Sequence, residues 1–343
     1  MNKIKISALA VSVMLLGGNI ASAASFTDMP QDAATSTAIE NAVANGLLSG
    51  YEDNTVRPDA NIKRSEMAAI ITRACKVDKE GDISRFTDVT KDDWFYSAMA
   101  KAYEMGAFSG DGNNMNPENN ITFQECFTVL SQVFDLIPPY TRPAEMPETA
   151  PEGTLISGNR LYDITALDTF SDKAEIADWA KVFIAGVVSN GGWSGVDGKI
   201  TPKAYITRAQ FSVVMDNLIK NYIDEPGTYT ELPDGNTMIR CDGVILENIT
   251  TDDDIYIGDS VSANGITVNN VTANKRFVIR GCATPAVNEE GKLSYGEEGI
   301  TVTGHFEAMR VIRPYINLNM SAATYGTVYS VRDTNLSVGI SIK

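Results

Sequence analysis

The pattern of apolar and polar positions changes once along the chain. Before residue 222, apolar helical runs follow polar, glycine-containing loops, as at Met67–Ile71, Phe127–Leu130 and Phe211–Leu218. From Glu225 onward, short apolar runs alternate with turn residues, which is typical of β-strands. We therefore expect an α+β multidomain protein, with a helical part followed by a small all-β domain over residues 225–343.

The helical part repeats three times. Each unit opens with an aromatic-x-Asp triplet, and a helix-like segment then ends at a glycine. A second glycine follows four residues later, and a proline and a second apolar helix complete the unit. The triplets are Phe26-Thr27-Asp28, Phe86-Thr87-Asp88 and Phe170-Ser171-Asp172; the glycines are Gly46, Gly106 and Gly191, then Gly50, Gly110 and Gly195; the prolines are Pro58, Pro117 and Pro202. One such unit cannot bury its apolar stripe alone, so three are expected to pack into one domain.

Local chemistry gives some of these positions a role. The first glycine of each unit suits the left-handed residue that ends a helix. The opening aspartates are expected to be helix N-caps, because their side chains accept otherwise unpaired amide N–H groups. The units span residues 25–79, 85–136 and 169–222. A proline-rich insertion, residues 137–168, separates the second from the third, and Thr154–Ile164 is a candidate hairpin within it.

A second repeat is present in the β region. Residues 243–250 align with residues 265–272, and residues 254–257 align with 276–279, so both offsets are 22 residues. This is about one coil of a right-handed parallel β-helix, and the strands resemble those of pectate-lyase-like solenoids. We expect Asn248 to stack on Asn270, and Asp253 and Asp254 to pair with Lys275 and Arg276. Residues 300–343 either continue the coil or form a small sandwich.

The N-terminus is typical of a signal peptide, residues 1–23. Lys3 and Lys5 precede the mostly apolar run Ile6–Leu16, and Ala21-Ser22-Ala23 is a small-residue cleavage site. The alternative is an N-terminal membrane anchor, for which the run is short. We expect no transmembrane segment in the mature chain, because no other stretch approaches 18 apolar residues.

Composition excludes several functions. The formal net charge is −16, and removal of two lysines with the signal peptide gives 26 − 44 = −18, which argues against a nucleic-acid partner. The single histidine, His305, rules out a His-rich zinc site, and we expect it to be a surface or packed residue of a strand. We predict no metal and no cofactor. Four cysteines are too few for a disulfide scaffold; Cys241 and Cys282 either pair across coils or are free, and Cys75 and Cys126 lie on the closing helices of separate units.

The three units resemble S-layer homology (SLH) repeats. The marks of that family are an opening F-x-D, a tryptophan a few residues later, G-Y-x-D-G/N-x-F-x-P and a closing T-R-A-E. The corresponding residues here are Gly50–Pro58, the tryptophans Trp94 and Trp179, and the closing motifs Lys63-Arg64-Ser65-Glu66, Thr122-Phe123-Gln124-Glu125 and Thr207-Arg208-Ala209-Gln210. The resemblance covers Ser25–Tyr222.

The resemblance implies a three-pronged spindle that binds secondary cell-wall polysaccharide without a covalent bond. The ligand is commonly a pyruvylated amino-sugar polymer on peptidoglycan, and the grooves lie between neighbouring repeats. The motif arginine is associated with the anionic substituent and the tryptophan with sugar contact. A guanidinium that forks onto a carboxylate and an indole that covers a sugar face suit these roles. The candidate carbohydrate-binding residues are Lys63, Arg64, Glu66, Trp94, Glu125, Trp179, Arg208, Gln210, Gly50, Gly110 and Gly195.

Three positions depart from the family pattern. Phe123 replaces the arginine of the second unit, Ala34 stands where Trp94 stands in the second unit, and Gln210 replaces the glutamate of the third. We therefore expect the Arg64 and Arg208 grooves to bind and the Phe123 groove to lack an anion anchor. As alternatives, the arginines pair with acids at helix ends, and the tryptophans pack in the core.

Together these features predict an exported protein on the extracellular face of a bacterial cell wall, which anchors there and displays its β domain without catalysis. One alternative is an SLH-anchored polysaccharide-active enzyme, with calcium at Asp252-Asp253-Asp254 and a uronic acid at Arg280. The other is a self-assembling S-layer subunit, so self-association at the cell surface stays open.

Overall fold

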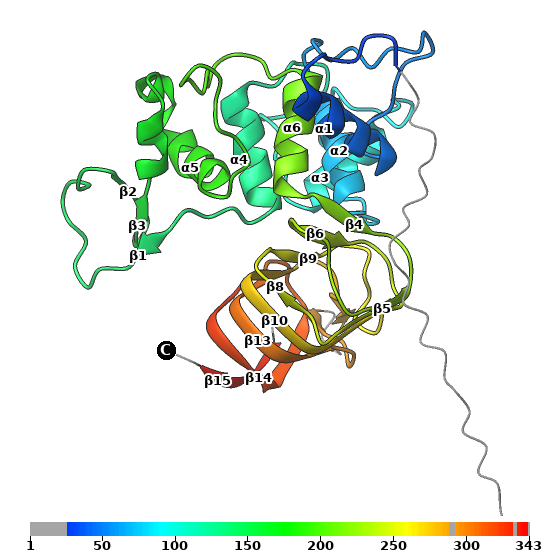
Figure 1. The fold of residues 1–343 in the computed structure, drawn as a ribbon, viewed down its shortest axis with the longest axis vertical. Coiled ribbons are helices and arrows are strands. Elements are labelled where there is room, and N and C mark those ends of the chain that lie inside the picture. The colour runs from blue at the N-terminus through cyan, green and yellow to red at the C-terminus, as the bar shows by residue number, and fades with distance from the viewer. Residues whose placement is uncertain (1–25, 288–291, 332–334, 342–343) are drawn as a thin grey trace, which may run out of the picture.

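The computed structural model describes residues 26–287, 292–331 and 335–341, and the expected signal peptide lies outside them. A helical bundle sits on a β-solenoid (Figure 1). The bundle contains α1 (Ala33–Ala44), α2 (Arg64–Ala74), α3 (Tyr96–Glu104), α4 (Phe123–Val133), α5 (Lys181–Ser189) and α6 (Arg208–Leu218). The α+β multidomain class is thereby confirmed. No helix among the described residues is long and apolar enough to cross a membrane.

Each of the three units forms an opening helix, a loop and a closing helix. The opening helices α1, α3 and α5 end before Gly46, Gly106 and Gly191, whose φ angles are +69°, +76° and +74°. The predicted left-handed helix-ending glycines are therefore confirmed. The helices pair between units, α1 with α6, α2 with α3 and α4 with α5, and all three units share one buried core.

A closed ring of backbone hydrogen bonds joins the three units. The amide of Ile62 donates to the carbonyl of Ile206 (3.0 Å), Ile206 donates to Ile121 (3.1 Å), and Ile121 donates to Ile62 (3.1 Å). All three isoleucines are fully buried. The closing helices begin two residues after each isoleucine, so the ring sets the three helix N-termini around a common point.

The opening aspartates do not cap helices, so this prediction was wrong. Each carboxylate instead accepts two amide N–H groups of its own unit's loop, from 27 to 29 residues away. Asp28 accepts from Val56 and Arg57, Asp88 from Met115 and Asn116, and Asp172 from Ile200 and Thr201, at 2.7–2.9 Å. The N-cap of α1 is instead Asp32, whose side chain accepts the Thr35 amide.

The insertion between the second and third units forms a small antiparallel sheet. It contains β1 (Tyr140–Thr141), β2 (Thr154–Ser157) and β3 (Arg160–Asp163) in the order β1-β3-β2, which confirms the hairpin expected at Thr154–Ile164. The short 3-10 helices η1 (Thr165–Thr169), η2 (Lys173–Glu175) and η3 (Asp178–Ala180) then lead into α5.

The C-terminal part is a parallel β-solenoid. Its strands are β4 (Asn221–Ile223), β5 (Gly227–Tyr229), β6 (Thr237–Ile239), β7 (Val244–Glu247), β8 (Thr250–Thr251), β9 (Ile255–Ile257), β10 (Ile266–Ile279), β13 (Ile300–Val311), β14 (Asn317–Ser330) and β15 (Asn335–Ser341). The antiparallel hairpin β11 (Pro285–Val287) and β12 (Leu293–Tyr295) leaves the coil between β10 and β13.

The register of the solenoid confirms the 22-residue repeat. Val268 lies beside Leu246 and Phe277 beside Ile255, in parallel strands. The Asn270 side-chain amide donates to Asn248 Oδ1 at 2.8 Å, and the expected acid–base pairs between coils are present. The strands β13, β14 and β15 continue the coil by parallel pairing, which excludes the sandwich. The solenoid begins at β4, four residues before the expected boundary at 225, because β4 pairs with β6 directly after α6.

Arginines of the solenoid reach the C-terminal ends of four helices. Arg240 donates to carbonyls at the ends of α1 and α2, Arg313 to Glu104 of α3, and Arg276 and Arg280 to the residues that end α4. These carbonyls carry the negative end of the helix dipole, so cations are favoured there. The bundle and the solenoid are thereby joined through specific polar contacts as well as apolar packing.

Candidate carbohydrate-binding grooves

The first residue of each closing helix faces the loop of a neighbouring unit. These residues are Arg208, Arg64 and Phe123, and their amides donate to Ala60, Asn119 and Ala204, each at 2.9 Å. The third unit therefore contacts the first, the first contacts the second, and the second contacts the third. Sequence comparison had placed the motif arginines at two of these three interfaces.

Arg208 is almost completely buried between the third and first units. Its Nε donates to the Val56 carbonyl at 2.9 Å, and its Nη2 donates to the Ser49 carbonyl at 2.9 Å. Its Nη1 donates to Glu66 Oε1 at 3.2 Å. Pairing of a motif arginine with a helix-end acid, one of the alternatives, therefore holds for Arg208.

A cavity of about 250 Å³, which we call the Trp94 cavity, lies beside this arginine. Tyr51, Glu66 and Arg73 of the first unit, Trp94 of the second and Arg208 of the third are among its lining residues. Trp94 is 65% exposed, which excludes the alternative that it packs in the core. The cavity thus brings together the exposed indole of Trp94 from the second unit, Arg73 from the first unit and Arg208 from the third.

Arg73 is a lining residue that the sequence comparison missed. It lies in the last turn of α2, it is exposed, and its Nη1 donates to the Leu47 carbonyl at 3.1 Å. The sequence signal was available, because Arg73 stands seven positions after Glu66, and seven residues are close to two full turns of a helix with 3.6 residues per turn.

Arg64 lies at the equivalent interface between the first and second units. Its Nε donates to the Met115 carbonyl at 3.1 Å, and its guanidinium lies 4.7 Å from the centre of the Phe108 ring. Burial lowers the pKa of Arg64, while the carboxylates of Glu125 and Asp88 act in the opposite direction. Within the described residues its two Nη atoms have no hydrogen-bond partner, so they are available to a ligand.

The third interface is closed by aromatic rings. Phe123 is buried, and its ring centre lies 5.4 Å from that of Trp193 and 5.6 Å from that of Phe127. Trp193 takes the place that Phe108 has beside Arg64, and the motif comparison did not single it out. This interface holds apolar packing at the position where the other two hold a guanidinium.

The acids of the closing motifs take part in capping boxes. Glu66, Glu125 and Gln210 accept the amides of Lys63, Thr122 and Thr207 at 2.8, 2.9 and 2.9 Å. Such pairs satisfy N–H groups that a helix start leaves free. Lys63 forms an exposed ion pair with Glu118, which raises its pKa.

The candidate glycines have a structural reason that the sequence comparison did not give. A Cβ added at Gly50, Gly110 or Gly195 would lie 2.1, 2.3 or 2.6 Å from the ring of the opening phenylalanine of its own unit. The close approach of Phe26, Phe86 and Phe170 therefore requires glycine. Gly50 also lines the Trp94 cavity.

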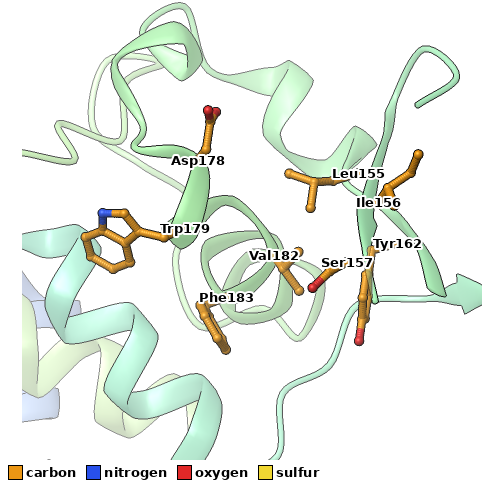
Figure 2. A pocket seen from close by; sticks show the side chains of 8 residues that line it. All are labelled: Leu155, Ile156, Ser157, Tyr162, Asp178, Trp179, Val182 and Phe183. Atoms are coloured by element: carbon orange, nitrogen blue, oxygen red, sulfur yellow. The ribbon is translucent and has the colours of Figure 1, made fainter. Parts of the chain in front are cut away.

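Trp179 is 53% exposed on η3, so it too lies outside the core. Figure 2 shows its indole beside α4, and the Ala177 amide donates to Gln124 Oε1 of that helix at 3.3 Å. Trp179 also borders a cavity of about 500 Å³ between the insertion hairpin and α5.

The solenoid residues considered for catalysis all have protein partners. Asp252 accepts from Asn274 at 2.7 Å, Asp253 pairs with Lys275, Asp254 with Arg276, and Arg280 with Asp259 at 2.6 Å. Among the described residues, no group of three His, Cys, Asp or Glu side chains is arranged to hold a metal ion. His305 lies in β13 beside Thr324 (2.9 Å), and all four cysteines are free thiols.

Comparison with known proteins identifies the first two helical units. The model of the S-layer homology domain matches residues 25–68 and 85–125. The chain therefore contains S-layer homology domains in its first two units, which confirms the resemblance inferred from the motifs. This module and the surface-layer and anchoring relatives point to a cell-wall-anchored extracellular protein, as expected from the sequence.

Three relatives illustrate the range of proteins with similar segments. The chain is 30% identical over 208 residues to the Surface-layer 125 kDa protein of Lysinibacillus sphaericus, which is 59% of this chain and 16% of that protein. It is 38% identical over 76 residues to the Cellulosome-anchoring protein of Acetivibrio thermocellus (22% and 17%), and 25% identical over 183 residues to Exoglucanase XynX of Acetivibrio thermocellus (53% and 15%). The chain thus spans less than a fifth of the length of each of these relatives.

Proposed function

We propose that the protein anchors itself non-covalently to the cell wall by binding anionic secondary cell-wall polysaccharide in the Arg208 and Arg64 grooves. The observation that carries this proposal is the Trp94 cavity, where an exposed indole, Tyr51, Arg73 and Arg208 meet. The indole offers apolar area to a sugar face, and the guanidinium groups bind a carboxylate substituent. In a chain with a net charge of −16, such a local cluster is needed to attract an anionic polymer.

We assign residues 169–222 as a third S-layer homology repeat. Its support is the closed isoleucine ring, the aspartate that ties down the loop, and the capping box at Thr207, each of which repeats the first two units. On this assignment the chain carries three repeats. The Phe123 interface then has a structural role, because it joins the second repeat to the third by apolar packing.

The solenoid has the role of a displayed or structural element in this proposal. The rival function is that of a polysaccharide-active enzyme, since some relatives carry glycosidase names such as Exoglucanase XynX. The ion pairs that occupy Asp253, Asp254 and Arg280 favour display over catalysis. Incubation of the purified chain with acidic and neutral wall polysaccharides, followed by a reducing-end assay, separates the two, because any release of reducing ends favours the enzyme.

The anchoring proposal is tested with cell-wall sacculi in a sedimentation assay. Native sacculi are compared with sacculi whose secondary polysaccharide has been removed by acid. The proposal expects the protein to sediment with native sacculi only. Equal binding to both would make peptidoglycan the ligand, and binding to neither would overturn anchoring.

Substitutions then locate the grooves. Trp94→Ala removes an exposed indole, and Arg64→Gln removes a guanidinium whose Nη atoms have no hydrogen-bond partner among the described residues. Each is expected to weaken binding about tenfold. Tyr205→Ala is the matched control, because Tyr205 is an exposed aromatic residue at the Phe123 interface. Equal losses in all three variants would contradict the assignment of the grooves. Sedimentation velocity of the same samples shows whether the chain assembles with itself.

A further inference from the structure

The insertion hairpin encloses a cavity that belongs to none of the three inter-unit interfaces. It measures about 500 Å³ and lies between the hairpin β2–β3 and helix α5 (Figure 2). Leu155, Ser157 and Tyr162 line it from the hairpin, and Val182 and Phe183 line it from α5. Its volume is in the range of small-molecule sites, and its walls are largely apolar and aromatic.

Arg160 lies on the same face of the hairpin as the lining residues Ser157 and Tyr162. Arg160 of β3 lies directly opposite Ser157 of β2 in the antiparallel hairpin, and Tyr162 is two positions further along β3. The side chains of Ser157, Arg160 and Tyr162 therefore lie on one face of the hairpin. The Arg160 Nη1 donates to the Tyr162 hydroxyl at 3.1 Å, which raises the pKa of Arg160. Tyr162 therefore contacts the cavity and the guanidinium at once.

Arg160 is also stacked among tyrosines. Its guanidinium carbon lies 4.7 Å from the centre of the Tyr140 ring and 6.0 Å from that of Tyr329 on β14. Arg142 lies 5.7 Å from the centre of the Tyr140 ring. The cluster thus joins the insertion to the solenoid and fixes the guanidinium in place.

This cluster carries the positive charges of Arg142 and Arg160. Within the described residues neither Arg142 nor Arg160 forms an ion pair with a carboxylate, although the chain as a whole is strongly acidic. The carboxylate that lines the cavity, Asp178, is paired with Lys181 at 2.6 Å. An anionic group that enters the cavity would therefore meet Arg160 without an opposing unpaired charge.

We propose that this cavity is a second saccharide site, which takes a carboxylate-bearing sugar with its ring against Phe183 and Tyr162 and its carboxylate on Arg160. The arginine is preorganised by its tyrosine contacts, so less side-chain entropy is lost when it binds. The site lies outside the Arg64 and Arg208 grooves, and Trp179, one of the candidate carbohydrate-binding residues, also lines it.

The test uses trigalacturonic acid as the probe and its methyl ester as the neutral match, titrated into the full chain by calorimetry. The acid is expected to bind at least tenfold more tightly than the ester, and added salt is expected to reduce this difference. Equal binding of the two, or no binding of the acid at millimolar concentration, would overturn the site.

Two substitutions, each with a control, test where trigalacturonic acid binds. Arg160→Gln removes the cation and Ser157→Trp fills the cavity from an exposed position, and each is expected to weaken binding at least tenfold. Arg85→Gln removes an arginine that is stacked on Phe86 elsewhere, and Asn159→Trp adds the same bulk at the hairpin turn outside the cavity. Losses confined to Arg64→Gln and Trp94→Ala would assign the probe to the grooves and overturn this proposal.

Discussion

Glu66 serves two helices at once, because Arg208 of the third unit donates to its Oε1 while the backbone of Lys63 donates to its Oε2. The same carboxylate therefore completes the cap of α2 and holds the third unit against the first. Glu66 and Arg208 thus line the proposed ligand site and also stabilise the fold. The stability of an Arg208 variant must therefore be measured before its binding to sacculi is interpreted.

Arg208→Ala is expected to lower the free energy of unfolding by about 3 kcal/mol, because it leaves the carbonyls of Val56 and Ser49 and one oxygen of Glu66 without their donor. Urea denaturation measures the change. Arg64→Ala serves as the control and is expected to cost about 1 kcal/mol, since the Arg64 side chain donates only one hydrogen bond within the described residues. Equal costs would contradict this difference between the two interfaces.

Asp88→Ala is expected to cost about 2 kcal/mol, because the amides of Met115 and Asn116 lose their acceptor in a part-buried loop. Asp92→Ala provides a comparison at an exposed aspartate of the same unit and is expected to be neutral. Thermal unfolding monitored by circular dichroism reports both. A neutral Asp88→Ala would show that the loop does not need this tie.

Phe123→Arg restores the family residue at the third interface but is expected to destabilise the protein by several kcal/mol without any gain in sacculus binding. The arginine would enter an apolar contact with Trp193 and Phe127, where an unpaired charge is costly. Phe123→Leu keeps the site apolar and is expected to cost about 1 kcal/mol. A folded Phe123→Arg protein that binds sacculi more tightly would contradict a purely structural role for this interface.

Arg280→Ala tests the contact between the bundle and the solenoid. Arg280 is buried, pairs with Asp259 at 2.6 Å and donates to the Val133 carbonyl. Its removal leaves the buried Asp259 carboxylate with Arg313 at 3.6 Å as its remaining ion-pair partner, and is expected to cost about 3 kcal/mol. Calorimetry is expected to change from one unfolding transition to two. Lys275→Ala breaks an exposed pair and should change stability by less than about 1 kcal/mol. A single, unshifted transition in Arg280→Ala would argue against this contact as the link.

The cysteines give a prediction on pH. Burial raises the pKa of Cys75 and of Cys282 to about 12, against an ordinary value of 9.0. Above pH 9 the unfolded chain releases these protons and the folded chain keeps them, so the free energy of unfolding is expected to fall as the pH rises from 9 to 12.

The matching measurement is thiol labelling of the native protein at pH 8. Cys241, which is only partly buried, is expected to react first, and the other three only after unfolding. Cys75→Ala/Cys282→Ala is the control for the pH effect and should flatten the decline in stability. Early labelling of Cys75 would contradict the burial on which this prediction rests.

The candidate site could be predicted only in part from the sequence. The motif positions gave Arg64, Arg208 and Trp94, because the family marks recur at fixed spacing. Trp193 and Arg73 were missed, since neither stands at one of the family marks, although Trp193 occupies the repeat position of Phe108. The partners that decide what each arginine can do, Glu66 for Arg208 and Phe108 for Arg64, come from other units.

The sequence by itself determined the features that depend on neighbours along the chain or on a regular period. These are the three units, the glycines that end the opening helices and the 22-residue coil of the solenoid, because backbone conformation and strand register repeat locally. Only the tertiary structure decided the role of Asp28, Asp88 and Asp172, the closed Phe123 interface, the arginines at the helix ends and the cavity beside Arg160. Each of these rests on contacts between residues far apart in sequence, and such contacts leave no local pattern to read.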